Sequence, residues 1–256
     1  MKLQLKSGAL GYIDQGEGPV VLLIHAFPLN NAMWSPQLEP LSSRFRVIAP
    51  DIRGFGESQP PSPWSMEDMA DDLNALLDAL EAKDAAIAGV SIGGYIALTF
   101  WWKYPNRVRQ LVLSNSRARN DSDAEKTARN EMIAAIEQNG AGILPDRMLP
   151  RLLQPNPSAE VVRTVRGMID KANDSAAAYA VMAMRDRMDF SSILHRINRP
   201  TMVITGENDA IIRVEDAEAV ADGIAGARFV KIPNSGHLSN LENPAAFNTA
   251  LLSFLV

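Results

Sequence analysis

The sequence predicts an α/β fold in which a mostly parallel, doubly wound sheet is covered by helices on both faces. Short apolar runs typical of buried strands alternate with helical segments along most of the chain, and this alternation is characteristic of a parallel sheet. The chain has 256 residues, of which 46% are hydrophobic. This is enough for one large core and an inserted segment.

The expected strands follow one another from the N-terminus. Residues 3–6 and 10–14 predict a short antiparallel start that turns at Gly8. Six further runs predict the strands of the main sheet: 20–25, 45–49, 85–90, 110–114, 201–205 and 228–232. Runs of this kind suit parallel strands that are buried on both faces.

Helical segments separate these strands. The sequence Ser65-Met66-Glu67-Asp68 resembles a capping box, and apolar residues recur behind it at helical spacing as far as Leu80. A last helix is expected over residues 244–254. Residues 118–194 break the alternation, with several helical segments and no convincing strand. We therefore expect a helical cap at 118–194, inserted after the sixth strand of the main sheet into an α/β core of residues 1–117 and 195–256.

Composition and charge exclude several functions. A formal net charge of −5 leaves no basic stripe for phosphates, so nucleic acid is not an expected partner. The absence of cysteine excludes disulfides, thiolate metal sites and cysteine nucleophiles, and the three histidines are too far apart in sequence to suggest a metal site. The start lacks the apolar run of a signal peptide, and Val20–Ile24, the longest apolar run, is too short to cross a bilayer. We expect a cytoplasmic protein without a membrane partner.

A serine between two glycines lies where the strand at 85–90 would meet a helix. The segment Gly89-Val90-Ser91-Ile92-Gly93 has the G-x-S-x-G spacing of a nucleophile elbow. Such a turn strains the serine backbone, and the small residues on either side let strand and helix pass without collision. The hydroxyl then stands at the positive end of a helix. Ser91 is the predicted nucleophile, with a structural serine in a tight turn as the alternative.

Two further candidates follow later strands in a consistent order. Asp209 comes after the strand at 201–205, and His237 comes after the strand at 228–232. Reactive side chains gather at the carboxyl ends of parallel strands. Imidazole can serve as general base and then general acid, and a carboxylate can fix its tautomer and stabilise the imidazolium. We predict these roles for His237 and Asp209, with Glu207 as the nearest rival carboxylate.

Together these motifs resemble serine α/β-hydrolases of the esterase, 3-oxoadipate enol-lactonase and cofactor-free perhydrolase group. The resemblance runs from about Gly11 to the end of the chain and is weakest over residues 118–194. It is most specific in four segments: 25–28, 50–58, the elbow, and 236–244. It implies an α/β-hydrolase fold with an inserted helical cap, and no cofactor.

The resemblance also implies an oxyanion hole made of two backbone N–H groups. One would come from Ile92, directly after the nucleophile. The other would come from Phe27 in the segment His25-Ala26-Phe27-Pro28, since proline has no N–H to donate. Ala26 stands where the family usually has glycine. His25 is expected to support this segment through hydrogen bonds.

Two other segments bear on the assignment of the site. Asp51 and Arg53 lie in a glycine-rich turn and are expected to lock a loop instead of reacting. Some relatives place the acid after the sixth strand of the sheet. That position here reads Ser114-Asn115-Ser116, without a carboxylate, which favours Asp209.

The leading hypothesis is a serine hydrolase that cleaves small carboxylic esters through an acyl-enzyme. Three alternatives stay open: hydrolysis of an enol-lactone such as that of 3-oxoadipate, perhydrolysis with hydrogen peroxide in place of water, and ligand sensing with little turnover. Turnover of simple aryl esters separates the last from the others. The expected partner is a small-molecule ester or lactone. The natural substrate and homo-oligomerisation are left open by the sequence.

Overall fold

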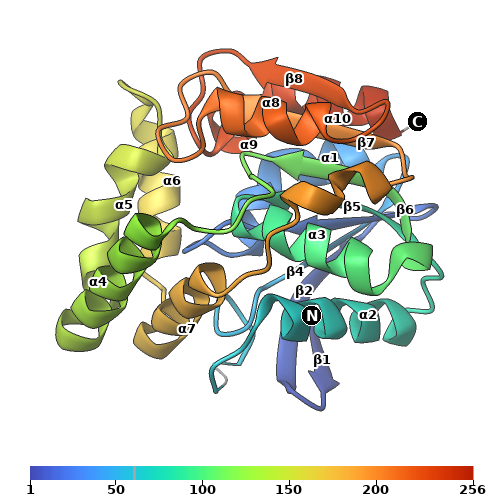
Figure 1. Cartoon of the computed structure of the whole chain (residues 1–256). Coiled ribbons are helices and arrows are strands. Elements are labelled where there is room, and N and C mark those ends of the chain that lie inside the picture. Colours follow the sequence, from blue (N-terminus) through green and yellow to red (C-terminus); the bar gives the residue numbers. More distant parts are fainter. Residues whose placement is uncertain (60–61, 256) are drawn as a thin grey trace.

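An eight-stranded sheet runs through the centre of the molecule (Figure 1). The computed structural model describes residues 1–59 and 62–255. The strand order is β1-β2-β4-β3-β5-β6-β7-β8. Strand β2 pairs antiparallel with β1 and with β4, and the neighbours from β4 to β8 pair in parallel. The predicted α/β class with a mostly parallel sheet is confirmed.

The strands lie within two residues of their predicted bounds. They are β1 (Lys2–Leu5), β2 (Gly8–Gln15), β3 (Val20–Ile24), β4 (Arg46–Pro50), β5 (Ala85–Val90), β6 (Val108–Ser114), β7 (Thr201–Gly206) and β8 (Arg228–Ile232). One detail of the prediction is wrong. The first turn occupies Lys6 and Ser7, and Gly8 begins β2 with a φ of 123°, a conformation that glycine adopts without steric cost.

Helices cover the sheet outside the inserted segment. They are α1 (Ser35–Ser42), α2 (Met66–Ala79), α3 (Ile92–Lys103), α8 (Val214–Asp222), α9 (Ser239–Glu242) and α10 (Pro244–Leu255). Short 3-10 helices are η1 (Asn31–Trp34), η2 (Pro105–Arg107), η3 (Ala141–Ile143) and η4 (Ser191–Arg196). The predicted capping box is present at α2, where the Ser65 side chain accepts from Asp68 N and the Asp68 carboxylate accepts from Ser65 N.

The chain between β6 and β7 is helical. It forms α4 (Asp123–Asn139), α5 (Leu144–Leu152), α6 (Ala159–Ile169) and α7 (Asp174–Arg185), and residues 118–194, all of them described, contain no strand. Helix α4 packs against α7, and α5 packs against α6. Figure 1 shows the four helices gathered at one side of the sheet. We propose that they form a cap over the site.

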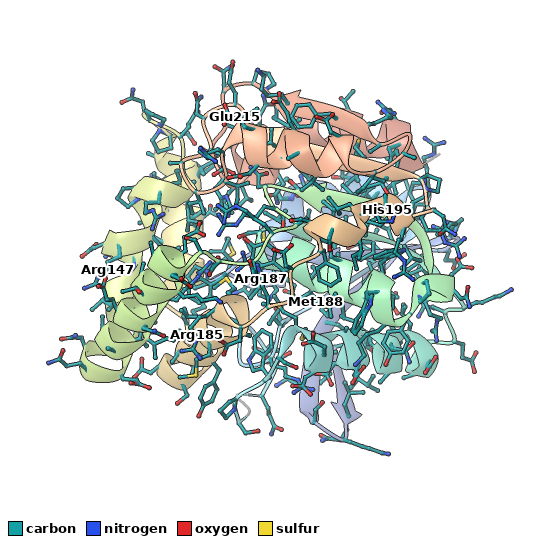
Figure 2. The ribbon with its side chains drawn as sticks, viewed as in Figure 1. Arg147, Arg185, Arg187, Met188, His195 and Glu215 are labelled. Carbon is teal, nitrogen blue, oxygen red and sulfur yellow. The ribbon has the colours of Figure 1, made fainter. Side chains whose placement is uncertain are left out.

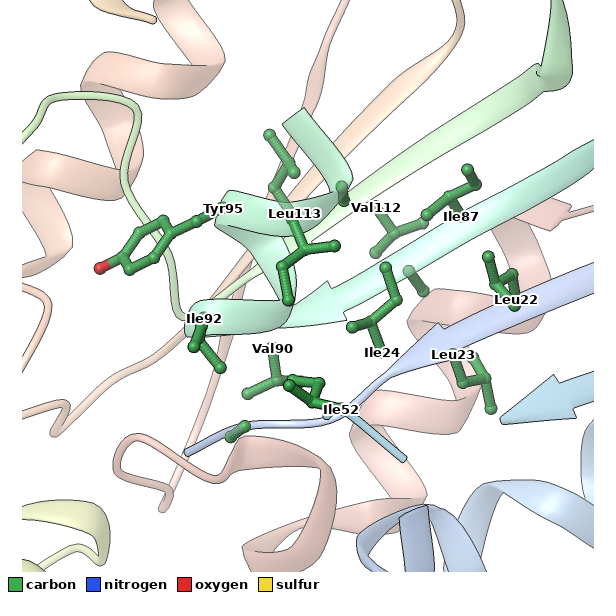
Figure 3. Close-up of a cluster of buried hydrophobic side chains, with 14 of the residues drawn as sticks. Leu22, Leu23, Ile24, Ile52, Ile87, Val90, Ile92, Tyr95, Val112 and Leu113 are labelled. Carbon is green, nitrogen blue, oxygen red and sulfur yellow. The ribbon is translucent and has the colours of Figure 1, made fainter. Parts of the chain in front are cut away.

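The central strands bring their carboxyl ends to one edge. Figure 3 shows buried side chains of β3, β5 and β6, among them Leu23, Ile87 and Val112, packed beside Ile92 and Tyr95 at the start of α3. Fully burying one aliphatic side chain of this size stabilises the fold by about 1.5–3 kcal/mol. The edge that carries the candidate site is therefore held by buried core side chains. Among the described helices, none is long and apolar enough to cross a membrane.

Candidate active site

Ser91 occupies the sharp turn between β5 and α3. Its backbone has φ 57° and ψ −117°, a conformation rare for a residue with a side chain. A residue held in such a conformation costs of order 1–3 kcal/mol and persists only where its surroundings impose it. The backbone N–H of Ser91 donates to Ser114 O at 2.9 Å, and Ser116 Oγ donates to Ser91 O at 3.0 Å. These contacts with the end of β6 fix the turn.

The glycines around Ser91 are required by close backbone approach. A Cβ added to Gly89 would lie 2.1 Å from Gly93 O, and one added to Gly93 would lie 2.3 Å from Ile24 O. Neither backbone oxygen can move aside without displacing β5, β3 or α3. The G-x-S-x-G spacing therefore reflects the packing of the first turn of α3 against the sheet.

Gly89→Ala is expected to lower the free energy of unfolding by about 1–3 kcal/mol, because overpacking forces the backbone to shift. Urea denaturation measures this change. Gly167→Ala in α6 is the control, since an added Cβ there has no atom within 4 Å. Alanine in that helix should stabilise the protein by about 0.5–1 kcal/mol. Equal stability of Gly89→Ala and the wild type would refute the described elbow.

His237 and Asp209 form a buried pair. Nδ1 of His237 lies 2.8 Å from Oδ2 and 3.0 Å from Oδ1 of Asp209, and the two side chains are 1% and 0% exposed. Burial raises the pKa of the Asp209 carboxyl, but the charge and hydrogen bond of His237, with further hydrogen bonds, hold that pKa below its ordinary value. An ionised carboxylate can only accept, so Nδ1 carries the proton and Nε2 is free to act as a base.

Asn115 contacts this pair, and the sequence analysis missed it. Its Nδ2 donates to Asp209 Oδ2 at 2.9 Å and to Gly236 O at 3.2 Å. Its Oδ1 accepts from Ser114 Oγ and Ser239 Oγ. Its φ of 48° is in the left-handed region that asparagine tolerates better than most residues. In the sequence, the residues after β6 were notable only because they include no carboxylate. In the structure, the Asn115 amide orients the carboxylate of Asp209.

The structure brings two of the three predicted catalytic side chains into direct contact. Within residues 1–59 and 62–255, no hydrogen bond joins Ser91 Oγ to His237. The segment 114–116 connects them instead, because it bonds to the Ser91 backbone and, through Asn115, to Asp209. In enzymes without substrate, catalytic hydrogen bonds are often long and tighten only in the reacting complex.

The two expected oxyanion donors lie in different segments. Ile92 is the first residue of α3, so its N–H has no partner inside the helix. The N–H of Phe27 donates to no described residue. Ala26 is outside the left-handed region, so its backbone conformation does not require glycine. Its carbonyl accepts from Leu29 N at 2.9 Å, which closes the turn around Phe27.

His25 supports the segment that contains Phe27. It is fully buried, its Nε2 accepts from Ile52 N at 2.8 Å, and its Nδ1 donates to Ala26 O at 2.9 Å. Burial lowers the pKa of His25 to about 4. The imidazole is therefore neutral near pH 7 and links the Phe27 turn to the loop that follows β4.

His25 should make stability depend on pH. Above about pH 6.5 the imidazole is neutral in both the folded and the unfolded chain. Between about pH 6.5 and about 4 the unfolded chain binds a proton that the folded chain excludes, so the free energy of unfolding falls, by up to about 3 kcal/mol. Chemical denaturation across this range should show a shallower decline for His25→Gln than for the wild type. Identical slopes would show that His25 is not buried in its neutral form.

The remaining candidates bond within the scaffold. Asp51 accepts from Asn31 N and Glu57 N at 2.8 and 2.9 Å, and burial raises its pKa. Arg53 forms an ion pair with Asp72 of α2. These bonds are those expected of residues that hold a loop. Glu207 is exposed and accepts from Asn234 N at 3.3 Å, and it does not contact His237 within the described chain.

Glu242 ties the His237 loop to the inserted helices. Its carboxylate accepts from Gly236 N and from Gln154 N, both at 2.7 Å, and His237 N donates to Leu152 O at 3.0 Å. The sequence analysis did not single out Glu242. In the part of the chain that the structure describes, no three His, Cys, Asp or Glu side chains are grouped to hold a metal ion.

Comparisons with known proteins agree with this fold. Residues 19–244 match the sequence family described as alpha/beta hydrolase fold. A curated relative, 3-oxoadipate enol-lactonase 2 of Acinetobacter baylyi, is 28% identical over 250 residues, covering 95% of this chain and 91% of its own. A thermophilic esterase from Thermogutta terrifontis, solved with malate bound, has a TM-score of 0.95 and 38% identity, covering 100% of this chain and 97% of that chain. The enol-lactonase from Burkholderia xenovorans LB400 has a TM-score of 0.91 and 26% identity, and the match covers 100% of this chain and 99% of that chain.

Proposed function

The chain belongs to the α/β-hydrolase fold family, and on that premise we propose that it is a serine hydrolase that cleaves small carboxylic esters. The observation that carries the proposal is the buried His237–Asp209 pair at the same sheet edge as a strained Ser91. A fold alone does not establish activity, and the site must supply it. Here the site offers a nucleophile, a base, an orienting acid and two backbone N–H donors.

The proposed reaction proceeds through an acyl-enzyme. Ser91 Oγ attacks the ester carbonyl carbon while His237 Nε2 takes the hydroxyl proton. The negative charge that develops on the carbonyl oxygen is stabilised by the N–H groups of Ile92 and Phe27. His237 then gives its proton to the departing alcohol as the C–O bond breaks. Water, deprotonated by His237, attacks the acyl-enzyme and releases the acid and free Ser91.

Asp209 and Asn115 act on this reaction through His237. The carboxylate keeps the proton on Nδ1 and stabilises the imidazolium that forms in each step. Asn115 holds one carboxylate oxygen at 2.9 Å, and the backbone N–H groups of Ile211 and Ile212 hold the other at 2.8 and 3.0 Å. With both oxygens bonded, the orientation of the imidazole is fixed before substrate arrives.

Hydrolysis of an enol-lactone is the second candidate. It uses the same nucleophile, base and oxyanion donors, and relatives named as 3-oxoadipate enol-lactonases favour it. One set of assays also distinguishes perhydrolysis and ligand sensing from ester hydrolysis. Purified protein should be assayed with aryl esters, one enol-lactone, and an ester plus hydrogen peroxide. Rapid ester turnover supports the proposal, and a strong preference for the lactone or for peroxide reassigns the substrate. If the protein turns over none of these substrates, the proposal is rejected.

We expect activity on aryl esters to be highest for short acyl chains. The pocket beside the site is small, about 160 Å³, and each methylene changes apolar recognition by about 1–3 kcal/mol. Activity should therefore decline once the acyl chain outgrows the cavity. The measurement is kcat/KM from acetate to palmitate. A maximum at long chains would contradict a closed pocket.

A further inference from the structure

The pocket beside the candidate triad is lined by apolar side chains and also by charged ones, among them Asp121 and Arg129. Phe27, Tyr95, Ile211 and Ile212 line this pocket, and helix α4 contributes Arg129 and other residues to it. Three of these residues bond directly to the proposed machinery. Tyr95 N donates to Ser91 O, and the N–H groups of Ile211 and Ile212 donate to Asp209. An ester whose carbonyl lies at Ser91 would extend one of its ends into this pocket.

Arginines surround a single buried carboxylate at the wall of this pocket. The Asp121 side chain is 0% exposed and lies 2.6 Å from Arg117, 2.8 Å from Arg187 and 3.0 Å from Arg129. Glu125 bonds to Arg117 and Arg119. Burial raises the pKa of Asp121, but the arginines lower it further, so the pKa stays below its ordinary value and the carboxyl is ionised. Hydrogen bonds from Arg119 lower the pKa of Glu125.

The cluster has more positive than negative charge. Five guanidinium groups face three carboxylates: those of Arg117, Arg119, Arg129, Arg187 and the exposed Arg213 face those of Asp121, Glu125 and Asp216. Among these groups the positive charges outnumber the negative ones by two, and Arg151 lines the same pocket. A partly buried charge without a partner is costly, whereas one that meets a carboxylate forms a strong charge-assisted hydrogen bond.

In two of these arginines, Arg117 and Arg187, both terminal nitrogens have acceptors within the protein, while the buried Nε has none. Arg187 donates to Met184 O and Arg119 O, bonds to Asp121 and stacks over the Tyr95 ring at 4.3 Å. Figure 2 shows it where the inserted helices meet the core. Arg117 uses both terminal nitrogens on Glu125 and Asp121. They hold the two ends of the inserted segment together.

Arg129 is different. Of its three guanidinium nitrogens, Nε donates to Asp121 and Nη1 contacts the thioether of Met184 at 3.5 Å. Its Nη2 has no acceptor among the described residues. A thioether is a weak acceptor. The Arg129 side chain is 25% exposed, whereas that of Arg117 is 7% exposed. Its two terminal nitrogens present a planar fork, the geometry that binds a carboxylate through two parallel hydrogen bonds.

We propose that this pocket selects esters or lactones that carry a carboxylate, and that Arg129 binds this carboxylate while Ser91 attacks the ester carbonyl. The inference rests on the proposed function and adds the substrate class. Arg129 is a specificity residue here and takes no part in proton transfer. The competing view is that Arg129 only helps to fix Asp121.

The experiment compares matched charged and neutral esters. An aryl hemisuccinate is paired with an aryl pentanoate of similar length, and acetylated 4-hydroxybenzoate is paired with phenyl acetate, so that the carboxylate lies on the acyl or the alcohol side. The ratio of kcat/KM within each pair is measured for the wild type, Arg129→Gln and Arg129→Lys. Arg147→Gln is the control, because Arg147 is an exposed residue on α5 that points away from the core in Figure 2.

We expect Arg129→Gln to lower the charged-to-neutral ratio in at least one pair by about 10- to 100-fold, mainly through KM, as for loss of charge-assisted hydrogen bonds. Arg129→Lys should lower the charged-to-neutral ratio by a smaller factor, because lysine keeps the positive charge but lacks the planar pair of terminal nitrogens. This variant also tests the inference if Arg129→Gln does not fold. Arg147→Gln should leave the ratio unchanged. Ratios that stay within about twofold in both Arg129 variants would overturn the inference.

A binding readout separates this inference from the proposed function. Succinate should raise the Tm of the wild type and of Ser91→Ala, and should raise that of Arg129→Gln much less. If the wild type hydrolyses neutral esters but shows neither a succinate shift nor a ratio dependent on Arg129, the carboxylate site is absent and the hydrolase stands. If succinate binds through Arg129 but no ester is hydrolysed, the proposed function fails and the site stands.

Discussion

Ser91→Ala is expected to lower kcat for hydrolysis of a short aryl ester by at least about 10³-fold, and up to about 10⁶-fold. The smaller loss already corresponds to about 4 kcal/mol of transition-state stabilisation. Without the hydroxyl no acyl-enzyme can form, although the N–H groups of Ile92 and Phe27 can still polarise the carbonyl. Steady-state kinetics on purified wild type and variant measure the loss.

The control for Ser91 is a buried serine at the same edge of the sheet. Ser235 Oγ donates to Ile232 O at 2.9 Å, and Ser235 lies two residues before His237. Ser235→Ala should lose about 1 kcal/mol of stability and keep most of its turnover. The Tm of Ser91→Ala should stay close to that of the wild type, because alanine retains the strained backbone. An active Ser91→Ala enzyme would exclude Ser91 as the nucleophile.

Asp209→Asn is expected to lower kcat by about 10⁴-fold. The asparagine amide can still accept from the N–H groups of Ile211 and Ile212. However, a neutral amide neither stabilises the imidazolium of His237 nor holds the proton on Nδ1. The base then adopts the wrong tautomer, while the packing around it hardly changes. Activity should fall much more than stability, as kinetics and urea denaturation of the same preparation would show.

Glu207→Gln is the matched comparison for Asp209→Asn. Glu207 precedes Asp209 by two residues and is exposed, and among the described residues its carboxylate accepts only from Asn234 N. Its substitution should change kcat less than about twofold, because the Glu207 carboxylate makes no contact with His237 among the described residues. If Glu207→Gln is the inactive variant and Asp209→Asn is active, the acid has been assigned to the wrong residue.

The strands were predictable because burial on both faces leaves a clear pattern. Strands β5 and β8 have the predicted bounds, and β3 differs by one residue. The start of β6 was placed two residues late, since Val108 is buried but Arg109 interrupts the apolar run. Arg109 is partly buried and pairs with Asp84 at 3.0 Å, a contact that the local sequence does not indicate.

The candidate triad residues could be proposed from the sequence because Ser91 directly follows β5, and Asp209 and His237 lie in the loops after β7 and β8. The supporting residues could not. Asn115 bonds to Asp209, which lies 94 positions later in the chain, and Glu242 bonds to Gln154 of the inserted segment. Such contacts depend on how loops pack together, and neither residue has a spacing that marks it. Gly89 was predictable because its close backbone approach, to Gly93, lies within one turn, whereas Gly93 also approaches Ile24 of β3.

The arginine cluster was not predictable for a related reason. Arg117, Asp121 and Arg129 lie close in sequence, but Arg187 joins them only after α4 to α7 have folded back. As isolated residues they resemble an ordinary charged, solvated segment. Tertiary packing buries Asp121 and leaves the guanidinium fork of Arg129 at the pocket.

Covalent labelling tests the central proposal most directly. Wild-type protein is incubated with a short-chain aryl phosphonate ester, and its intact mass and peptide map are recorded. We predict one adduct per chain on Ser91, formed much more slowly in Asp209→Asn and absent in Ser91→Ala. An adduct on a different residue that persists in Ser91→Ala, or no adduct in a folded wild-type protein, would contradict a serine nucleophile at this site.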